Sequence, residues 1–373
     1  MLNRMTGLFK YIPIPREHSP DIYSVDYENL KKLGFTTILM DYDFTITGWR
    51  DDNITDKTLK LFDSLIEQGF KVAIVTNTKR EKVKIIEELT DGKVKVYTSM
   101  KKPDTKKLKE VLEELDSKES ETVIIGDLFI TDISAGNKLG LYTILINPYT
   151  YGLESKFKKF VAAFSKFAYN VFFYTIGWFF RLIDLAGPNE FKETVFDIDY
   201  EQLKENGYKM LIFDFDNTLN EYHKDFLTPE ATDLLIRLKE MGFYILIATN
   251  GRKKRFKALE ADLDELGVDL LAAARKPLKF KIKKKIKYLG YKPSEIVMIG
   301  DQLFTDIACG NVFKFYTIKV EPLTENEGIW TKTVRFFEKI ALKWIREKPT
   351  LGKDEEETEV DEESPSYVDK LTK

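Results

Sequence analysis

Short apolar runs recur along the chain, with polar residues within or just after the ends of most of them. They alternate with longer stretches in which apolar residues are spaced three or four positions apart. A short apolar run predicts a buried strand, and the longer spacing predicts a helix with one apolar face. The alternation predicts an α/β fold, with a parallel sheet, helices on both of its faces and a functional site where the strands end. The runs are 38–46 and 211–219, 72–77 and 245–250, 122–127 and 296–301, and 143–147 and 317–320.

The runs come in pairs because the sequence repeats itself. The pattern Asp-x-Asp-x-Thr at 41–45 recurs at 214–218, which is 173 residues later (214 − 41). A predicted helix follows each copy, with Thr55 or Thr228 placed as its N-cap and a glycine just past its end. The sequence therefore predicts a tandem duplication of one domain. We expect a first domain at 1–150, an aromatic linker helix at 151–187, a second domain at 188–325, a basic helix at 326–350 and an acidic tail at 351–373.

The composition is consistent with two globular domains and indicates the cellular compartment of the protein. The chain has 373 residues, of which 43% are hydrophobic, and this is enough for a core in each domain. Its one cysteine, Cys309, excludes an internal disulfide and predicts a reducing, cytoplasmic location. Residues 352–373 hold nine acidic and three basic residues, so we expect a disordered tail. The rest of the chain is only mildly basic, which argues against nucleic-acid binding.

Two segments outside the repeated strands combine aromatic and basic residues. The first, Phe157 to Gly187, is rich in phenylalanine, but only fourteen residues separate its charged positions Lys166 and Arg181. That is shorter than the roughly 20 residues needed to cross a bilayer. The second segment, 326–350, has apolar residues at helical spacing with lysine and arginine between them. Both patterns predict amphipathic helices, which either lie peripherally on a membrane surface or pack on the domains.

Polar residues with catalytic chemistry follow the strands in the same order in both halves. Carboxylates suit nucleophilic attack on phosphorus, proton transfer and Mg²⁺ binding, while hydroxyl and ammonium groups stabilise phosphoryl oxygens. The set in the second half is Asp214, Asp216, Thr249, Lys276, Asp301 and Asp306, and the set in the first half is Asp41, Asp43, Thr76, Lys102, Asp127 and Asp132. We expect the eight aspartates of these sets to hold Mg²⁺.

This ordered set resembles the haloacid dehalogenase superfamily of phosphatases. The resemblance implies that Asp214 attacks phosphorus to form an aspartyl phosphate, and that Asp216 protonates the leaving group and then activates water. It also implies that Asp301 ligates Mg²⁺ and that Asp306 supports the site from beside it. The fold it implies is a Rossmann-like domain, here present twice.

A narrower resemblance points to a substrate. Phe196-Asp-Ile-Asp199, Asp214 to Leu219, Arg275-Lys-Pro277 and Gly300 to Asp306 are similar to subclass IIIA, YqeG-like phosphatases and to the phosphatidylglycerophosphate phosphatases. The spacing between motifs, 33 residues (249 − 216) and 27 residues (276 − 249), leaves no room for a cap domain. An open, capless site suits a lipid head group, so the resemblance implies release of phosphatidylglycerol at the inner face of the membrane.

Alternative functions remain open from the sequence. The same chemistry would serve a soluble phosphomonoester such as a nucleotide or sugar phosphate. A phosphoacceptor signalling domain also uses aspartates on a parallel sheet, but it carries the phosphorylated aspartate and its acidic pair on different strands. The first half departs from the pattern, with Phe44 in place of Asn217 and Leu128 in place of Gln302. We therefore expect the second half to carry most activity, with a non-catalytic docking role for the first half as the alternative.

Overall fold

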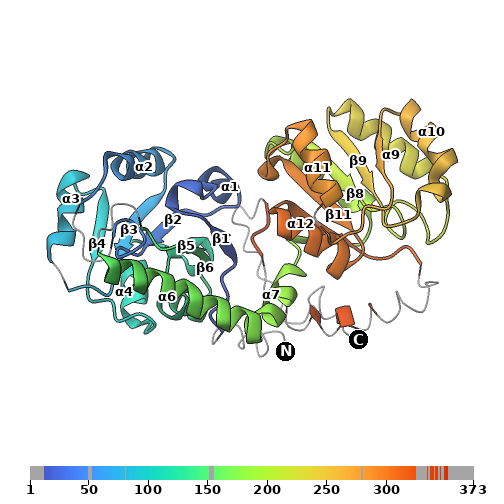
Figure 1. Cartoon of the computed structure of the whole chain (residues 1–373). Coiled ribbons are helices and arrows are strands. Elements are labelled where there is room, and N and C mark those ends of the chain that lie inside the picture. Colours follow the sequence, from blue (N-terminus) through green and yellow to red (C-terminus); the bar gives the residue numbers. More distant parts are fainter. Residues whose placement is uncertain are drawn as a thin grey trace, which may run out of the picture. The chain divides into compact units, whose positions relative to one another are not determined.

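The computed structural model describes residues 12–48, 53–79, 81–150, 155–278 and 280–324, together with 334, 337–339, 341–342, 345 and 348–351. The predicted acidic tail lies outside these residues, apart from Leu351. The chain divides into two compact units, and the boundary falls between Arg181 and Leu182. Each unit is described by itself (Figure 1).

Each unit is built on one six-stranded sheet, and every pairing within it is parallel. The strand order is the same in both units when the second sheet is read from its β7 edge. In the first unit the order is β1 (Glu17–Ser19), β6 (Tyr142–Ile146), β5 (Thr122–Gly126), β2 (Thr37–Met40), β3 (Lys71–Val75) and β4 (Val94–Tyr97). In the second it is β7 (Glu190–Lys192), β12 (Tyr316–Val320), β11 (Ile296–Gly300), β8 (Met210–Phe213), β9 (Tyr244–Ala248) and β10 (Asp269–Leu271). The predicted α/β fold and its duplication are confirmed.

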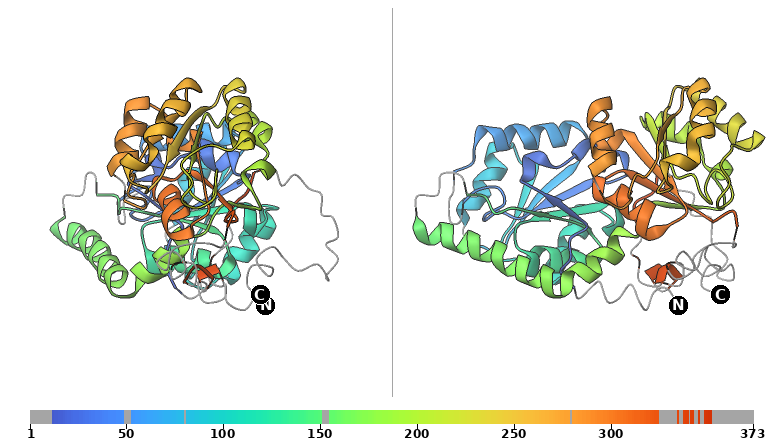
Figure 2. Two further views of the ribbon diagram at one scale, coloured as in Figure 1. Left: turned by 90° about the vertical axis from the view of Figure 1, so that its right-hand side faces the viewer. Right: turned by 45° about the vertical axis from the view of Figure 1, so that its right-hand side comes forward.

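Helices cover both faces of each sheet (Figure 2). Successive strand residues point to opposite faces, and in the first unit they enter two different cores, with Ile38 and Met40 in one and Leu39 in the other. The helices of the first unit are α1 (Tyr27–Lys32), α2 (Asp56–Glu67), α3 (Ile85–Leu89), α4 (Lys106–Glu114), α5 (Ser134–Leu139) and α6 (Lys156–Phe172). Those that follow are α7 (Trp178–Leu185), α8 (Tyr200–Glu205), α9 (Pro229–Glu240), α10 (Lys257–Glu265), α11 (Phe280–Leu289) and α12 (Ala308–Phe313).

Local signals in the sequence fix the ends of the main helices. The Thr55 hydroxyl accepts a hydrogen bond from the Thr58 amide at the start of α2, and the Thr228 hydroxyl accepts one from Ala231 at the start of α9. Both threonines are the predicted N-caps. Only α9 lies between β8 and β9, and only a short 3₁₀ turn and α10 lie between β9 and β10, so the second unit is capless as predicted.

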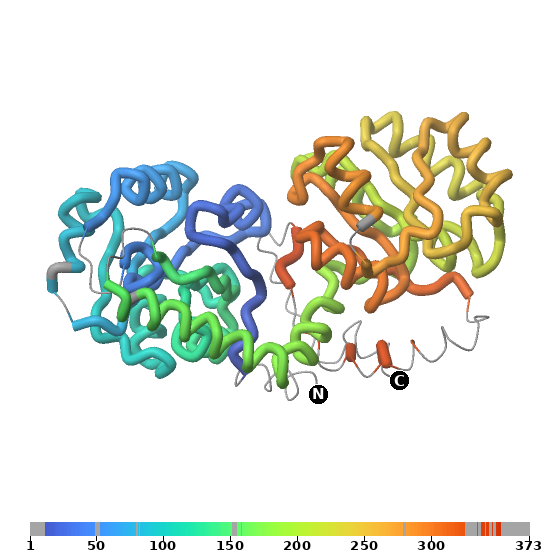
Figure 3. The backbone as a smooth tube through the Cα atoms, in the orientation of Figure 1, coloured from blue at the N-terminus to red at the C-terminus, as the bar shows by residue number. Residues whose placement is uncertain are grey.

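The aromatic segment is helical as predicted. Helix α6 leads without a break into a π-helical turn, η7 (Phe173–Gly177), and then into α7, and the smooth tube in Figure 3 follows this path. Its inner face packs on the first unit, where Ala168, Tyr169 and Phe172 contact Phe129 and Leu145. Among the residues that the structure describes, no helix is both long and apolar enough to span a bilayer.

The basic segment 326–350 is described in part; residues 334, 337–339, 341 and 342 are helical, and this helical part packs on the second unit. Ala341 and Leu342 are buried there, and Leu342 joins a cluster with Ala186, Leu303 and Ile307. Ala341 and Leu342 stand 173 residues after Ala168 and Tyr169, which cover the matching surface of the first unit. The duplication therefore extends through one further helix in each unit, which we call the trailing helix: α6 in the first unit and the described helical residues 334, 337–339, 341 and 342 in the second.

Candidate active site

The second unit brings four predicted residues together at the carboxyl edge of its sheet. Asp214 follows β8 and Asp301 follows β11, and these strands are paired neighbours. Asp306 lies in the π-helical turn η11 (Leu303–Ile307). The three carboxylates offer oxygen atoms within 4.8 Å of one another, and all three residues are buried. The Nζ atom of Lys276 lies 2.7 Å from an oxygen of Asp214 and 2.5 Å from one of Asp306.

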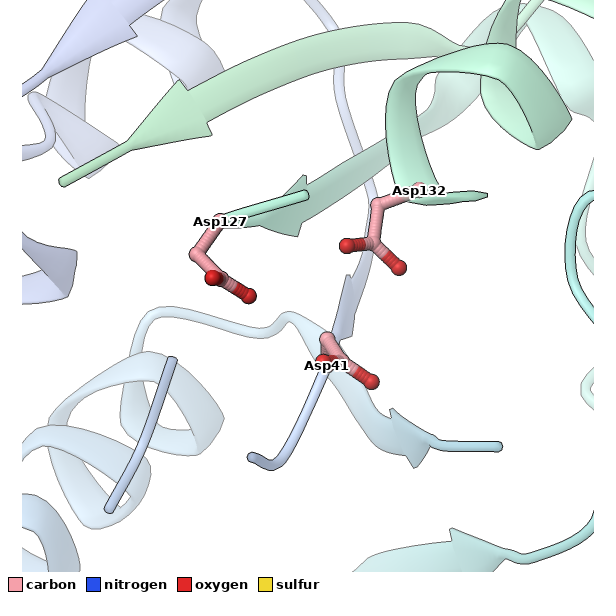
Figure 4. Close-up of side chains that lie close together, drawn as sticks. All are labelled: Asp41, Asp127 and Asp132. Atoms are coloured by element: carbon pink, nitrogen blue, oxygen red, sulfur yellow. The ribbon is translucent and has the colours of Figure 1, made fainter. Parts of the chain in front are cut away.

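The first unit repeats this arrangement with the same residue types. Asp41, Asp127 and Asp132 form the matching cluster, with ligand oxygens within 4.8 Å, and their side chains lie close together in Figure 4. The Lys102 ammonium lies 2.8 Å from Asp41 and 2.5 Å from Asp132. The first half therefore retains the complete cluster despite its departures from the motif pattern.

A glycine before each middle aspartate allows this close approach. A Cβ atom added at Gly126 would lie 2.4 Å from the side chain of Asp132, and one added at Gly300 would lie 2.5 Å from that of Asp306. No side chain fits at either position without displacing the carboxylate. The Gly-Asp pair at the end of β5 and β11 is thus a packing requirement of the cluster.

Each cluster places three buried carboxyl groups beside one lysine. Burial raises the pKa of Asp132 to about 6, against the opposing effect of Lys102. Burial also raises the pKa values of Asp127 and Asp214 well above their usual range. Burial lowers the pKa of Lys276, but Asp214 and Asp306 raise it more, so this lysine stays charged. Three hard oxygen donors with one ammonium match the preferences of a divalent cation such as Mg²⁺.

Two asparagines hold the lysine loops in place. The Asn250 amide donates to the Lys276 carbonyl at 3.1 Å and accepts from the Lys276 backbone N–H at 2.7 Å. Asn77 makes the same pair of bonds with Lys102, at 2.9 and 2.7 Å. Each asparagine directly follows a threonine of the motif. Both ends of the amide are used, so each lysine loop is fixed to the end of the neighbouring strand.

The predicted threonines Thr249 and Thr76 are buried just after β9 and β3. Their hydroxyl oxygens accept hydrogen bonds from the N–H of Gly251 at 3.0 Å and of Thr78 at 3.2 Å. These bonds fix the two hydroxyl oxygens next to the lysine loops. Thr45 and Thr218 also carry buried hydroxyls, which have no hydrogen-bond partner among the described residues.

Asp216 is placed apart from the carboxylate cluster, which among the described residues contains neither Asp216 nor Asp43. Its two oxygens instead accept hydrogen bonds from Arg255, at 2.9 and 2.7 Å. The Arg255 guanidinium also donates to the Lys224 carbonyl. The sequence motifs do not single out Arg255, although it ends a basic run, Arg252 to Arg255, that begins just past Thr249.

The turn after the second aspartate explains one departure of the first half. Asn217 has a positive φ of 58°, a conformation that asparagine adopts readily, and Phe44 has a φ of 60° at the same place. A phenylalanine there is strained, but its ring is buried against Val161 and Ala162 of α6. The loop after β2 in the first unit is therefore anchored to α6.

A buried glutamate from the trailing helix reaches the site of the second unit. The Glu338 carboxylate accepts hydrogen bonds from the N–H groups of Leu303, at 2.6 Å, and Phe304, at 3.4 Å. These amides begin the turn η11 that carries Asp306. Sequence motifs give no signal for this contact, because it joins positions 35 residues apart.

Comparisons with known proteins agree with the geometry of both units. Residues 214–313 match a family model described as haloacid dehalogenase-like hydrolase, and residues 50–146 match a second model of the same description. The Probable phosphatase YqeG of Bacillus subtilis is 33% identical over 161 residues, which cover 43% of this chain and 92% of that protein.

Two further relatives carry more specific names. Phosphatidylglycerophosphate phosphatase 1 of Arabidopsis thaliana is 34% identical over 40% of this chain, and the match spans 45% of that protein's own length. A Glyceraldehyde 3-phosphate phosphatase of Pyrococcus furiosus is 32% identical over 25% of this chain and 40% of that protein. Of these three matches, the one to YqeG covers nearly the whole length of the relative, and the other two cover less than half of theirs.

Proposed function

Because this chain belongs to the haloacid dehalogenase-like hydrolases and is a phosphatase, we propose that it removes the terminal phosphate of phosphatidylglycerophosphate with the help of Mg²⁺. The observation that carries this proposal is the twin cluster of three buried aspartates and one lysine, present at the same strand ends in both units. The name of the Arabidopsis relative supports the lipid substrate.

The proposed reaction proceeds in two steps in the second unit. An oxygen of Asp214 forms a bond to phosphorus while the bond from phosphorus to the glycerol oxygen breaks, and Asp216 gives that oxygen a proton. Asp216 then takes a proton from water, whose oxygen attacks the aspartyl phosphate and restores the Asp214 carboxylate with release of phosphate. Lys276 offsets the charge on the phosphoryl oxygens, and Thr249 and its neighbouring N–H groups donate to them.

Asp214, Asp301 and Asp306 would hold Mg²⁺ in the second unit, and Asp41, Asp127 and Asp132 would hold it in the first. The sequence pattern also assigns Asp216 and Asp43 to the metal, but among the described residues neither belongs to these clusters, so we leave them out of the proposed ligand set. Bound there, Mg²⁺ would offset charge on the phosphoryl group and keep the nucleophilic aspartate anionic. The fit rests on the donor set, since buried carboxylates with raised pKa values need a cation beyond the single lysine.

A surface on α6, η7 and α7 supports action at a membrane. Seven apolar side chains with exposed fractions from 46% to 76% recur at alternating spacings of three and four residues, and together we call them the aromatic stripe: Phe157, Phe160, Phe164, Phe167, Val171, Tyr174 and Trp178. Helix α6 contains four lysines and no acidic residue. Large aromatic side chains flanked by lysines suit an anionic lipid surface. We propose a cytoplasmic protein bound peripherally to the inner face of the membrane.

One assay tests the substrate assignment. Phosphate release is measured from phosphatidylglycerophosphate in mixed micelles and from a soluble phosphomonoester, each with Mg²⁺ and with a chelator. We expect Mg²⁺-dependent release from the lipid at a higher kcat/KM than from the soluble ester. Release from the soluble ester alone would keep the phosphatase chemistry and overturn the lipid assignment.

A further inference from the structure

The first unit contains a pocket of about 430 Å³ that opens beside its carboxylate cluster. One wall comes from the ends of β1 and β6 and the other from α6 and η7, and Asp127 of the cluster also lines it. We propose that this pocket is the head-group subsite of the first active site, where it binds the glycerol and diester phosphate of an anionic phospholipid. The proposal rests on the proposed function and names the part of the substrate that the first unit recognises.

The lining of the pocket matches that chemistry. Lys166 lines it and forms no salt bridge with any residue that the structure describes, so its charge is available for a diester phosphate. Asn147, Ser165 and Asn170 supply hydrogen-bonding groups for glycerol hydroxyls. Asp127 lines the pocket and also belongs to the carboxylate cluster. A head group bound in the pocket would therefore have its terminal phosphate next to the cluster.

The walls of the pocket are held in a defined shape. The Tyr169 hydroxyl and the His18 ring nitrogen lie 2.9 Å apart, so α6 is tied to the end of β1 across the pocket. Tyr169 also packs edge-on against Phe129, with ring centroids 5.3 Å apart. A volume of 430 Å³ lies within the range of small-molecule sites, and acyl chains would have to leave it. Phe173 and Tyr174 line the pocket, and Tyr174 belongs to the aromatic stripe, so the chains would leave toward the proposed lipid surface.

The second unit differs at this place. Ser165 corresponds to Glu338, since both stand at the same point of the repeat (338 − 165 = 173). The short serine lines the pocket, whereas the Glu338 carboxylate is buried and bonded to the N–H groups of Leu303 and Phe304. The two sites thus share their catalytic cluster and differ in what surrounds it. We infer that the pocket gives the first unit a lipid preference of its own.

The test isolates the first site in the full-length Asp214→Asn variant with Mg²⁺. Two substrates are compared: a short-chain phosphatidylglycerophosphate kept below its micelle concentration, which removes any membrane effect, and p-nitrophenyl phosphate, which lacks the diester. Lys166→Ala is expected to raise KM for the lipid about tenfold and to leave kcat/KM for the soluble ester within about twofold. Ser165→Glu is expected to weaken lipid turnover similarly, and Lys159→Ala, on the same helix outside the pocket, is the matched control.

Three results would overturn the proposal in different ways. An equal loss of kcat/KM on both substrates in Lys166→Ala would mean that Lys166 supports the site without contacting the lipid head group. An Asp214→Asn variant inactive on both substrates, with the unmodified protein active on the lipid, would show that the first site does not turn over, and the proposed function would stand on the second unit alone. Unmodified protein that cleaves only the soluble ester would instead remove the lipid assignment itself.

Discussion

The guanidinium of Arg255 spans both carboxylate oxygens of Asp216, with N–O distances of 2.9 and 2.7 Å. Asp216 is the proposed acid and base, so the residue that moves the proton is held by a fixed fork of two hydrogen bonds. Both side chains are partly exposed, at 18% and 17%. We therefore propose that Arg255 is a positioning residue, which acts on the reaction through Asp216.

Removal of this arginine tests that role. We expect Arg255→Gln to lower kcat by about 10- to 100-fold with little change in KM, since misplacement of a proton-transferring group slows chemistry more than binding. Arg255→Lys should recover only part of the loss, because lysine cannot donate two bonds in a fixed fork. Steady-state kinetics on a soluble phosphomonoester measures both values in the Asp41→Asn background.

A double-mutant cycle separates this role from general damage. In the Asp216→Ala background, Arg255→Gln should cause almost no further loss, because its effect passes through Asp216. Additive losses would contradict a positioning role. Lys253→Gln, on the same turn but paired with Glu260, is the matched control and should leave kcat unchanged.

The buried carboxylates predict a link between pH, Mg²⁺ and stability. Burial raises the pKa of Asp132 to about 6, so the native state of the metal-free protein binds more protons than the unfolded state between about pH 4 and pH 6. The contribution of Asp132 to the free energy of unfolding is fully present below the pKa that this group has in the unfolded state, and it is lost as the pH rises through about 6. Mg²⁺ requires the ionised form, so we expect it to raise Tm more at pH 8 than at pH 5.

Thermal unfolding at several pH values, with Mg²⁺ or a chelator, measures this link. An Mg²⁺ effect that is the same at pH 5 and pH 8 would contradict it. The Asp127→Asn/Asp301→Asn variant is the control, because each cluster has lost a carboxylate and the pH-dependent gain should shrink.

The contact of Glu338 with the turn that carries Asp306 predicts a remote effect on the second site. Glu338→Ala leaves the N–H of Leu303 without its buried partner, and we expect a loss of about 2 kcal/mol in the free energy of unfolding. We also expect kcat of the second site to fall, since η11 loses its support. Denaturant unfolding and kinetics in the Asp41→Asn background measure both effects, with the exposed Glu265→Ala as control. Unchanged stability would mean that the contact is not formed in solution.

The aromatic stripe predicts membrane binding that is separable from folding. The triple variant Phe160→Ser, Phe164→Ser and Phe167→Ser removes exposed rings only, so Tm should not fall. Binding to anionic vesicles, followed by co-sedimentation, should weaken at least about tenfold. Tyr288→Ser, which removes another exposed ring in the second unit, is the control.

Two other results would contradict a role of the aromatic stripe in membrane binding. Unchanged vesicle binding would place the lipid contact elsewhere on the chain. A change in oligomeric state instead of vesicle binding would identify the stripe as a helix-pairing seam, since its spacing of three and four also suits a second helix.

The sequence predicts much of each site because the signals are local. Apolar strand runs place Asp214 and Asp301 at neighbouring strand ends, and threonine caps such as Thr55 mark helix starts. The edge strands β1 and β7 are not predicted, because three residues are too few to show a period. Arg255 is likewise missed, since its contact with Asp216 joins residues 39 apart and follows no motif.

The packing of the two trailing helices is also not predicted by the sequence. Their sequences predict amphipathic helices, yet only the structure shows which face packs, with Tyr169 on the first unit and Leu342 on the second. Phe44 is an example. It stands where the second unit has Asn217, so the sequence suggests that the motif is lost there, whereas in the structure its ring packs against α6. The effect of a residue that departs from a sequence motif can be judged only when its neighbours in the structure are known.

The most direct test of the central claim is Mg²⁺-dependent phosphate release from phosphatidylglycerophosphate by the unmodified protein, Asp41→Asn, Asp214→Asn and the double variant. We predict that Asp214→Asn removes most of the turnover, that Asp41→Asn removes the smaller remainder, and that the double variant is inactive. Asp214 is the proposed nucleophile and Asp41 is its counterpart in the first unit, so turnover in each unit should depend on its own aspartate. Turnover that is unchanged in Asp214→Asn would contradict a second-unit active site, and turnover that survives in the double variant would contradict the aspartyl-phosphate mechanism itself.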